Sequence, residues 1–202
     1  MPATICKVTI RGTAPYSQSR KVDPRFPRGK DESYEAWEDR VWRERVHTAD
    51  DGDSITIPAH ALHQAMVVGA QKGRLVPQVR NSSRERLAGR LETGVMVLGE
   101  ATTDMRKSAA QKITILAHSN GDRKAKKATR VERSYPAWDA WTATFEVALV
   151  DESLTLDDLR EALRWAGLVC GLGRFRPECM GHNGRFVIQS LAALDEGEGL
   201  AA

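Results

Sequence analysis

The sequence predicts an α+β fold with an antiparallel sheet, and three observations lead to that prediction. Residues 3–12 and 142–151 alternate apolar and polar side chains, which is the pattern of half-buried strands. Residues 154–171 place Leu159, Leu163 and Cys170 on one face of a helix that begins at the N-cap Thr155. The expected elements then follow one another along the chain in the order β-α-β-β-α-β.

Local signals supply the other elements of this order. Residues 53–71 begin as a short strand and continue as a helix from Pro58, because the missing N–H of a proline needs no partner in the first helical turn. Residues 94–101 are apolar on both faces, as in a central strand, and residues 185–191 form the last strand. This order is typical of the ferredoxin-like, or RRM-like, fold, in which two helices cover one face of a four-stranded sheet. The opposite face is left available for a partner.

The length of 202 residues favours a single domain, residues 1–202, which carries two insertions. The first insertion, residues 13–52, combines a loop rich in Pro, Ser and Arg with a short helix that has Ser33 as its N-cap. The second insertion, residues 102–141, is less regular, contains one expected strand at 112–118 and is strongly basic toward its end. Residues 72–90 are expected to form a polar, basic connection.

Composition narrows the class of protein. The net charge of +3 is only mildly basic, and no apolar stretch approaches the ~18–20 residues of a membrane span. The three cysteines include no Cys-x-x-Cys pair, which argues against a disulfide or zinc scaffold. We therefore expect a soluble, cytoplasmic protein that needs no membrane, no metal and no cofactor.

The junction between the last helix and the last strand, "GLGRFRPECMGHNGRF" at 171–186, combines flexibility with positive charge. Glycines allow positive φ and a close approach of backbone to a ligand, guanidinium groups match phosphate, and an outward phenylalanine can stack on a base. The segment therefore predicts a clamp for a phosphate backbone. The alternative is a helix C-cap and a turn with solvated arginines. The clamp residues are Gly171, Gly173, Arg174, Phe175, Arg176, Gly181, Gly184 and Arg185.

This junction resembles the glycine-rich loop of the repeat-associated mysterious protein (RAMP) superfamily, the RNA-binding subunits of CRISPR effector complexes. Members place such a loop between the last helix and last strand of a ferredoxin-like domain, often ending in Gly-Arg-Phe, as residues 184–186 do here. The Ile-Pro entry into the first helix, residues 57–63, is a second match, with Ala59 in place of the usual glycine and His63 in place of the usual Lys or Arg. The two matches cover the framework of the whole chain.

The resemblance implies RNA binding in which His60 and His63 contact the ligand at the helix start. It is closest to the backbone subunits, whose palm carries a projecting thumb, so residues 102–141 would be a basic, thumb-like insertion. The chain is also similar to compact stand-alone proteins of tailed-phage genomes.

Two basic segments would extend the binding track. Cations interleaved with aromatic residues suit single-stranded nucleic acid, and the alternative for both segments is a solvated loop. In the second insertion, Tyr135 or Trp138 would supply stacking. The N-terminal cations are Arg20, Lys21 and Arg25, and those of the second insertion are Arg123, Lys124, Lys126, Lys127, Arg130 and Arg133.

The sequence thus favours non-catalytic binding of single-stranded nucleic acid, with RNA ahead of DNA and with assembly as a homo-oligomer or in a multi-subunit ribonucleoprotein. A phage protein that binds single-stranded DNA in replication or recombination is one alternative. A metal-independent RNA endonuclease that uses His60 or His63 as general acid or base is another. A protein-binding mimic or inhibitor of a CRISPR complex is the third. We lean against an enzyme, because no Ser-His-Asp order stands out and the His-x-x-His at 60–63 lacks a third metal ligand.

Overall fold

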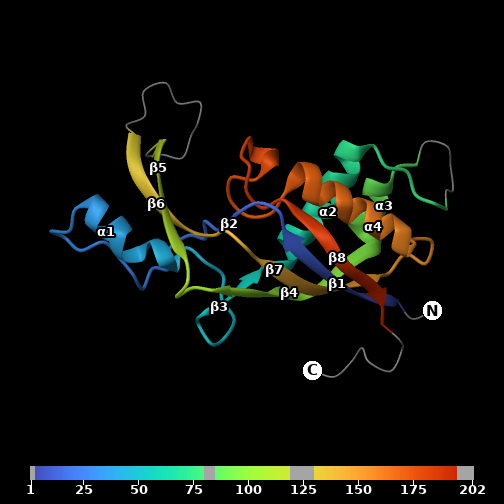
Figure 1. The fold of residues 1–202 in the computed structure, drawn as a ribbon, viewed down its shortest axis with the longest axis horizontal. Helices are drawn as coiled ribbons and strands as arrows, with labels where there is room; N and C mark the ends of the chain where they lie inside the picture. Colours follow the sequence, from blue (N-terminus) through green and yellow to red (C-terminus); the bar gives the residue numbers. More distant parts are fainter. Residues whose placement is uncertain (1–2, 80–84, 119–129, 195–202) are drawn as a thin grey trace.

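The computed structural model describes residues 3–79, 85–118 and 130–194 and contains a five-stranded antiparallel sheet (Figure 1). Its strand order is β3-β4-β7-β1-β8. The four strands predicted at 3–12, 94–101, 142–151 and 185–191 are all present, so the predicted α+β class with an antiparallel sheet is confirmed. The strands are β1 (Thr4–Gly12), β3 (Ser54–Ile57), β4 (Val95–Arg106), β7 (Thr142–Leu149) and β8 (Phe186–Ala193).

Alternation along the central strands decides which face of this sheet is buried. Cys6, Val8 and Ile10 of β1 are fully buried, whereas Lys7 between them is exposed and lies opposite Glu146 of β7. Burying only one set of alternate residues is what a half-buried strand requires. The helices lie on the buried side (Figure 1). They are α2 (Ala59–Gly73), α3 (Leu87–Gly94) and α4 (Leu156–Trp165).

The helix predicted at 154–171 is α4 followed by a π-helical turn, Ala166–Cys170. Thr155 caps α4 through a capping box: its hydroxyl accepts a hydrogen bond from the backbone N–H of Asp158, and the Asp158 carboxylate accepts one from the N–H of Thr155. Gly171, with φ of +71°, ends the helical segment and begins the glycine-rich loop.

The connection predicted at 72–90 is partly wrong, because it contains the first half of α3. Leu87, Ala88 and Leu91 are buried against the core at helical spacing, although arginines lie around them in the sequence. Arg90 is itself buried, and its Nε lies 2.6 Å from the carboxylate of Glu85. The ion pair with Glu85 thus allows Arg90 to be buried in a segment that the sequence pattern alone predicts to be a polar connection.

The two insertions meet in a projecting lobe built on a three-stranded sheet in the order β2-β6-β5 (Figure 1). The first insertion contributes β2 and α1, and the second contributes the hairpin of β5 and β6. Buried Glu38 of α1 joins the parts, since its carboxylate accepts hydrogen bonds from Arg45 at 2.7 Å and from the backbone N–H of Ser134 at 3.2 Å. The lobe elements are α1 (Tyr34–Val41), β2 (Tyr16–Ser17), β5 (Gln111–His118) and β6 (Arg130–Trp138).

Within the described ranges, no helix has both the length and the apolar character that crossing a bilayer requires.

Candidate nucleic-acid interface

The glycine-rich loop folds back on itself and onto the start of the first insertion. The N–H of Leu172 donates to the carbonyl of Gly184 at 3.0 Å, and the N–H of Gly184 donates to the carbonyl of Pro15 at 2.7 Å. The N–H of Arg174 donates to the carbonyl of Ser17 at 2.7 Å. Backbone hydrogen bonds therefore fix the loop between α4 and β8 against β2.

The glycines make this packing possible. Gly171, Gly173 and Gly184 have positive φ, as the sequence predicts. A Cβ on Gly173 would collide with the carbonyl of Ser17, and one on Gly184 would collide with the carbonyl of Leu172. The close approach that these glycines allow is thus made to the protein's own backbone. Gly181 likewise packs on the carbonyl of Phe175.

The three arginines of the loop have different surroundings. The guanidinium carbon of Arg174 lies 3.8 Å from the ring centroid of Tyr135 and 4.6 Å from that of Phe175. Arg176 forms an ion pair with Glu178 at 2.8 Å and donates to the carbonyl of Gly173. Arg185 donates to the carbonyl of Leu168, two residues before the end of the π-helical turn.

A pocket of about 250 Å³ brings together three segments that are far apart in the sequence. The first insertion contributes Arg20, the start of α2 contributes His60, and the glycine-rich loop contributes Arg174. We call it the candidate pocket. Its lining consists of Tyr16, Gln18, Ser19, Arg20, His47, Pro58, His60, Ala61, Gln64, Ala65, Cys170, Gly171, Leu172, Gly173, Arg174, Arg176 and Glu178.

Gln18 organises the side of the pocket that the first insertion forms. It is buried, and its amide nitrogen donates to the Tyr16 hydroxyl at 3.0 Å and to the carbonyl of Thr56 at 2.7 Å. Its amide oxygen accepts from the backbone N–H of His47 at 2.6 Å. Neither Gln18 nor His47 could be singled out from the sequence, because a single glutamine and a single histidine in irregular segments give no periodic signal.

The lining favours an anion. Helix α2 begins at this pocket, and its N-cap Pro58 makes no side-chain capping bond, so the positive end of the helix dipole faces the space. Arg20, Arg174 and Arg176 add three guanidinium groups, against one carboxylate, Glu178. Burial raises the pKa of Glu178, but the hydrogen bond and charge of Arg176 outweigh it, and the net pKa is lowered.

His47 and Cys170, which also line the pocket, have shifted pKa values. Burial, and then the charge of Arg20, lower the pKa of His47 below its ordinary 6.5; Glu100 partly opposes this shift, and His60 adds a smaller lowering. Burial, reinforced by Glu178, raises the pKa of Cys170 to about 12, so this thiol stays protonated at neutral pH.

Comparisons with known proteins address the fold. No family model and no curated protein matches the sequence. Among solved structures, Cmr6 from Pyrococcus furiosus superposes with a TM-score of 0.50 at 9% identity, covering 93% of this chain and 98% of Cmr6. A chain from the cryo-EM structure of the type III-B Cmr-beta bound to cognate target RNA gives a TM-score of 0.50 at 14% identity. That match covers 96% of this chain but only 61% of the other.

The chain shares the fold of RAMP-type CRISPR subunits. The resemblance inferred from the glycine-rich junction and the Ile-Pro helix entry is therefore confirmed at the level of the fold.

Several of the contact residues predicted from the sequence lie outside the candidate pocket. His63 Nε2 lies 3.0 Å from the carbonyl of Leu91, and the His63 side chain lines a separate hollow of about 280 Å³ beside Met96. Lys21 is exposed in the N-terminal loop, where Arg25 pairs with Asp23 at 3.0 Å.

The basic residues of the second insertion lie on the projecting lobe or beyond the described residues. Arg130 is exposed at the start of β6. Arg133 lies over the Tyr34 ring at 5.6 Å and 3.7 Å from the carboxylate of Glu38. Arg123, Lys124, Lys126 and Lys127 fall outside the described residues.

The expected stacking role of Tyr135 or Trp138 is wrong. Both side chains are only 4–5% exposed, and Arg174 covers the Tyr135 ring. The indole N–H of Trp138 donates to the carbonyl of Arg106 at 2.9 Å, as buried tryptophans usually find a partner. Phe175 remains half-buried, edge-on to Tyr135, with φ of +59°.

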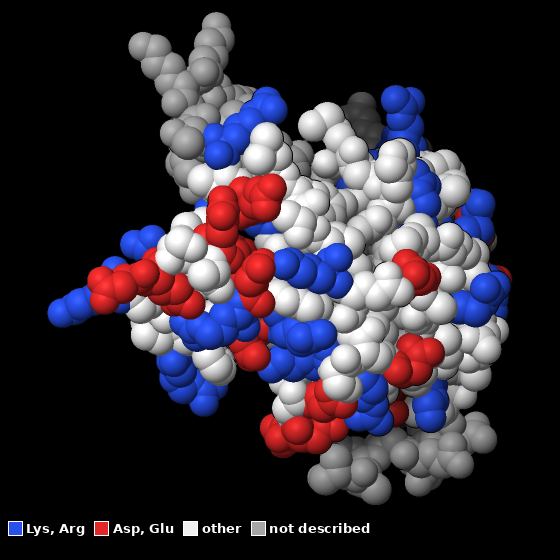
Figure 2. Space-filling view, turned by 60° about the vertical axis from the view of Figure 1, so that its left-hand side comes forward, with Lys and Arg blue, Asp and Glu red and all other residues white. Residues whose placement is uncertain are grey.

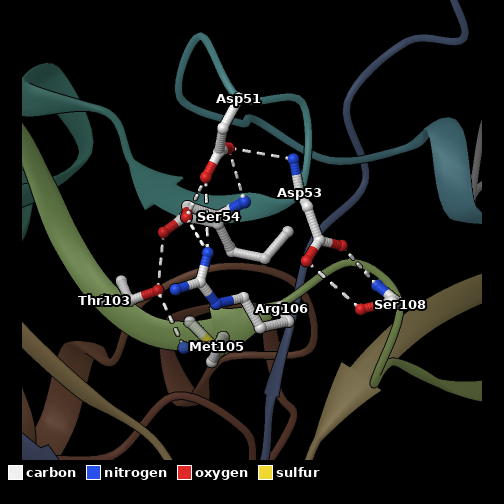
Figure 3. A network of polar contacts seen from close by, with 8 residues as sticks. Asp51, Asp53, Ser54, Thr103, Met105, Arg106 and Ser108 are labelled. Atoms are coloured by element: carbon white, nitrogen blue, oxygen red, sulfur yellow. Dashed lines mark hydrogen bonds and ion pairs between the residues drawn. The ribbon is translucent and has the colours of Figure 1, made fainter.

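The aspartates before and after Gly52 form a turn network at the edge of β3 and β4 (Figure 3). Asp51 accepts hydrogen bonds from the side chain and backbone of Ser54 and from the backbone N–H of Asp53, which together with the charge of Arg106 lower its pKa to about 2. Asp53 accepts from the N–H of Ser108 at 2.8 Å. These carboxylates hold the strand ends together. The described part of the chain contains no group of three or more His, Cys, Asp or Glu side chains arranged to hold a metal ion.

The face that carries the projecting lobe mixes both signs of charge, with Lys and Arg side chains lying among Asp and Glu (Figure 2). Lys112 lies 2.5 Å from Asp39, and Arg40 lies 2.9 Å from Glu32. Lys and Arg therefore form no broad basic surface on the part of this face that the structure describes.

Proposed function

We propose that this chain binds single-stranded nucleic acid, with RNA preferred, and that the candidate pocket is its central contact. The observation that carries the proposal is the convergence of Arg20, His60 and Arg174 on one pocket from three distant segments. Each segment was singled out from the sequence for a different reason. Three independently chosen residues would rarely line the same pocket by chance.

The arrangement of elements supports a ferredoxin-like framework of the RAMP type. Along the chain the framework elements run β1, α2, β4, β7, α4 and β8, and in the sheet the strands run β4-β7-β1-β8. In this framework the glycine-rich loop and the start of α2 lie at the same end of the sheet, which is why both can line one pocket.

The chemistry of the pocket suits a phosphate. Guanidinium groups present planar arrays of donors that match phosphate oxygens, and a helix N-terminus adds backbone donors and a partial positive charge. Arg20 and Arg174 would contact the ligand directly. Arg176 and Arg185, which pair with groups of the loop and its neighbouring helical turn, would keep the loop in shape.

The projecting lobe would extend the contact. Arg130 and Arg133 on β6, and Lys21 and Arg25 in the N-terminal loop, would lie along further phosphates, as would the basic residues between 121 and 134. We also propose assembly with further copies of this chain or with other subunits. A nucleic-acid strand longer than one pocket offers binding sites for several protein chains. The RNA bound in the Cmr-beta structure supports RNA over DNA as the ligand.

Fluorescence anisotropy tests this function. A labelled strand of about 12 nucleotides, as RNA, as DNA and as duplex RNA, is titrated with the wild-type protein and with an Arg20→Ala/Arg174→Ala variant. Arg164→Ala is the matched control, because Arg164 is paired to Glu161 on the exposed side of α4. We expect tight binding of single strands that only the double variant loses. Equal binding by the double variant would remove the pocket from the proposal, and no binding to any nucleic acid would overturn it.

A further inference from the structure

The hollow of about 280 Å³ beside Met96, which we call the second hollow, adjoins the candidate pocket. His60 lines both spaces, so the two meet at the first turn of α2. A strand whose phosphate occupies the candidate pocket therefore has a neighbouring nucleotide within reach of the second hollow. The second hollow is lined by Ala59, His60, His63, Glu92, Val95, Met96 and Val97.

The lining of the second hollow does not suit a phosphate. The described residues that form it include no Lys or Arg, and the acidic residue among them, Glu92, is exposed. No described residue forms an ion pair or hydrogen bond with the Glu92 carboxylate, so its negative charge would repel a phosphate. Met96, which is 53% exposed, adds an apolar surface. A flat group that is partly apolar and carries hydrogen-bond donors matches this lining, and in a nucleic acid that group is a base.

The backbone edge of β4 adds further polar groups to the second hollow. β3 pairs with β4 only from Ala101 onward, so no strand of the described part of the chain covers the outer edge of residues 95–98. The carbonyl of Gly94 accepts a hydrogen bond from the residue after β7, and hydrogen bonds to β7 alternate along β4. Val95 and Val97 therefore direct their backbone N–H and C=O groups to the outer edge, where a ligand can reach them.

A strand from a partner protein fits this edge less well than a base does. Strand addition to a sheet relies on a row of backbone hydrogen bonds. The free edge spans only residues 95–98, of which Val95 and Val97 face outward, and the regular pairing of β4 is interrupted between Leu98 and Thr102. So short an edge offers a protein strand few hydrogen bonds, whereas a single base needs few.

We infer that the second hollow binds a nucleobase of the strand held by the candidate pocket, and that it favours adenine or cytosine over uracil. This inference rests on the proposed function and names the bases that the site prefers. Adenine and cytosine present an amino donor beside a ring-nitrogen acceptor, which matches the Glu92 carboxylate and an outward backbone N–H of β4. Uracil presents a carbonyl oxygen in place of the amino group, and a carboxylate repels that oxygen.

Anisotropy titrations with two labelled RNA strands of about 12 nucleotides, oligo(C) and oligo(U), test the inference. Cytosine and uracil have rings of the same size, so the comparison isolates their hydrogen-bonding edges. Each strand is titrated with the wild type, Glu92→Gln and Arg20→Ala. Glu161→Gln is the matched control, because it removes an equal charge from the exposed side of α4, where Glu161 pairs with Arg164.

We expect the wild type to bind oligo(C) about tenfold more tightly than oligo(U), the size of one good hydrogen-bonded base contact. Glu92→Gln should abolish this preference, because an amide can also donate to the uracil oxygen. Arg20→Ala should weaken the binding of both strands and keep the preference, and Glu161→Gln should keep it as well.

Equal affinities of the wild type for the two strands would overturn this inference, leave nucleic-acid binding standing and make a protein segment the better occupant of the β4 edge. A preference for oligo(C) that survives in Glu92→Gln would also overturn it, because the base would then be read elsewhere. Failure of the wild type to bind either strand would overturn both this inference and the proposed function.

Discussion

At the scale of single residues, the account depends on how Arg174 is held. Its guanidinium lies 3.8 Å from the centroid of the Tyr135 ring while also lining the candidate pocket. Cation–π contact with a buried ring contributes on the order of 0.5–2 kcal/mol and fixes the plane of the guanidinium. Arg174 is therefore oriented before any ligand arrives, which lowers the entropic cost of binding.

This geometry predicts that lysine cannot replace Arg174. An Arg174→Lys variant keeps the charge but loses the planar group that lies on the ring and offers paired donors. We expect its affinity for single-stranded RNA to fall nearly as far as that of Arg174→Ala, by about tenfold, in anisotropy titrations. Wild-type affinity in the lysine variant would show that only charge matters at this position.

His47 predicts a pH dependence of stability. Burial and the nearby Arg20 lower its pKa in the folded protein below the ordinary 6.5, so the unfolded chain binds a proton more readily. The contribution of His47 to stability is therefore present above pH 6.5 and is lost as the pH falls through that value. Urea unfolding at about pH 7.5 and about pH 5.5 should show a larger loss of stability for the wild type than for His47→Gln. Equal losses would contradict the assignment.

At the scale of elements, the projecting lobe and the candidate pocket are linked through β6. Tyr135 of β6 is buried, contacts Arg174 on the pocket side and has the guanidinium of Arg45 5.5 Å from its ring centroid. Arg45 in turn pairs with Glu38 of α1 at 2.7 Å. Tyr135 is thus a positioning residue, which acts on the ligand through Arg174.

Substitutions of Tyr135 separate this role from a general effect on folding. Tyr135→Phe keeps the ring face, and we expect it to bind RNA as the wild type does. Tyr135→Leu removes the ring and should weaken binding about as much as Arg174→Ala, by roughly tenfold, with a double variant no weaker than either single one. Additive losses in the double variant would mean that Tyr135 does not act through Arg174.

Local sequence patterns were sufficient for the framework strands and for α1 and β5 of the lobe, but not for the pairing of β2 with β6 that builds the lobe sheet. The alternation in β1 and β7 and the capping signal at Thr155 are properties of short segments, so the corresponding elements could be predicted. The lobe depends on pairing between Tyr16 and Trp138, which are separated by more than half of the chain and carry no local signal for each other. For the same reason α3 was partly missed, since its buried face is short and lies among arginines.

The candidate pocket, like the lobe, could be predicted only in part from local sequence patterns. Arg20, His60 and Arg174 were chosen from the sequence one segment at a time, but only the fold shows that they meet. His60 and His63, three residues apart, share one face of α2 and both line the second hollow, but only His60 also lines the candidate pocket, and His63 Nε2 lies 3.0 Å from the carbonyl of Leu91. Gln18 and His47 are held at the pocket by hydrogen bonds between segments far apart in the chain, and no local sequence pattern predicts such bonds.

At the scale of the whole molecule, the net charge of only +3 argues against binding by a general positive field, and the face drawn in Figure 2 mixes both signs of charge. A few well-placed cations must then account for most of the salt dependence. Each phosphate neutralised on a single strand contributes about 0.7 to the slope of log affinity against log salt concentration. The slope therefore measures the number of phosphate contacts, and a variant that loses one contact shows a smaller slope.

This slope should be measured first, for wild type, Arg20→Ala and the control Arg164→Ala, with single-stranded RNA between about 50 mM and about 200 mM salt. If the candidate pocket holds a phosphate, the slope for Arg20→Ala is smaller than that of the wild type by about 0.7 or more, and the slope for Arg164→Ala is unchanged. Equal slopes for all three proteins would show that no phosphate lies beside Arg20 and would contradict the account.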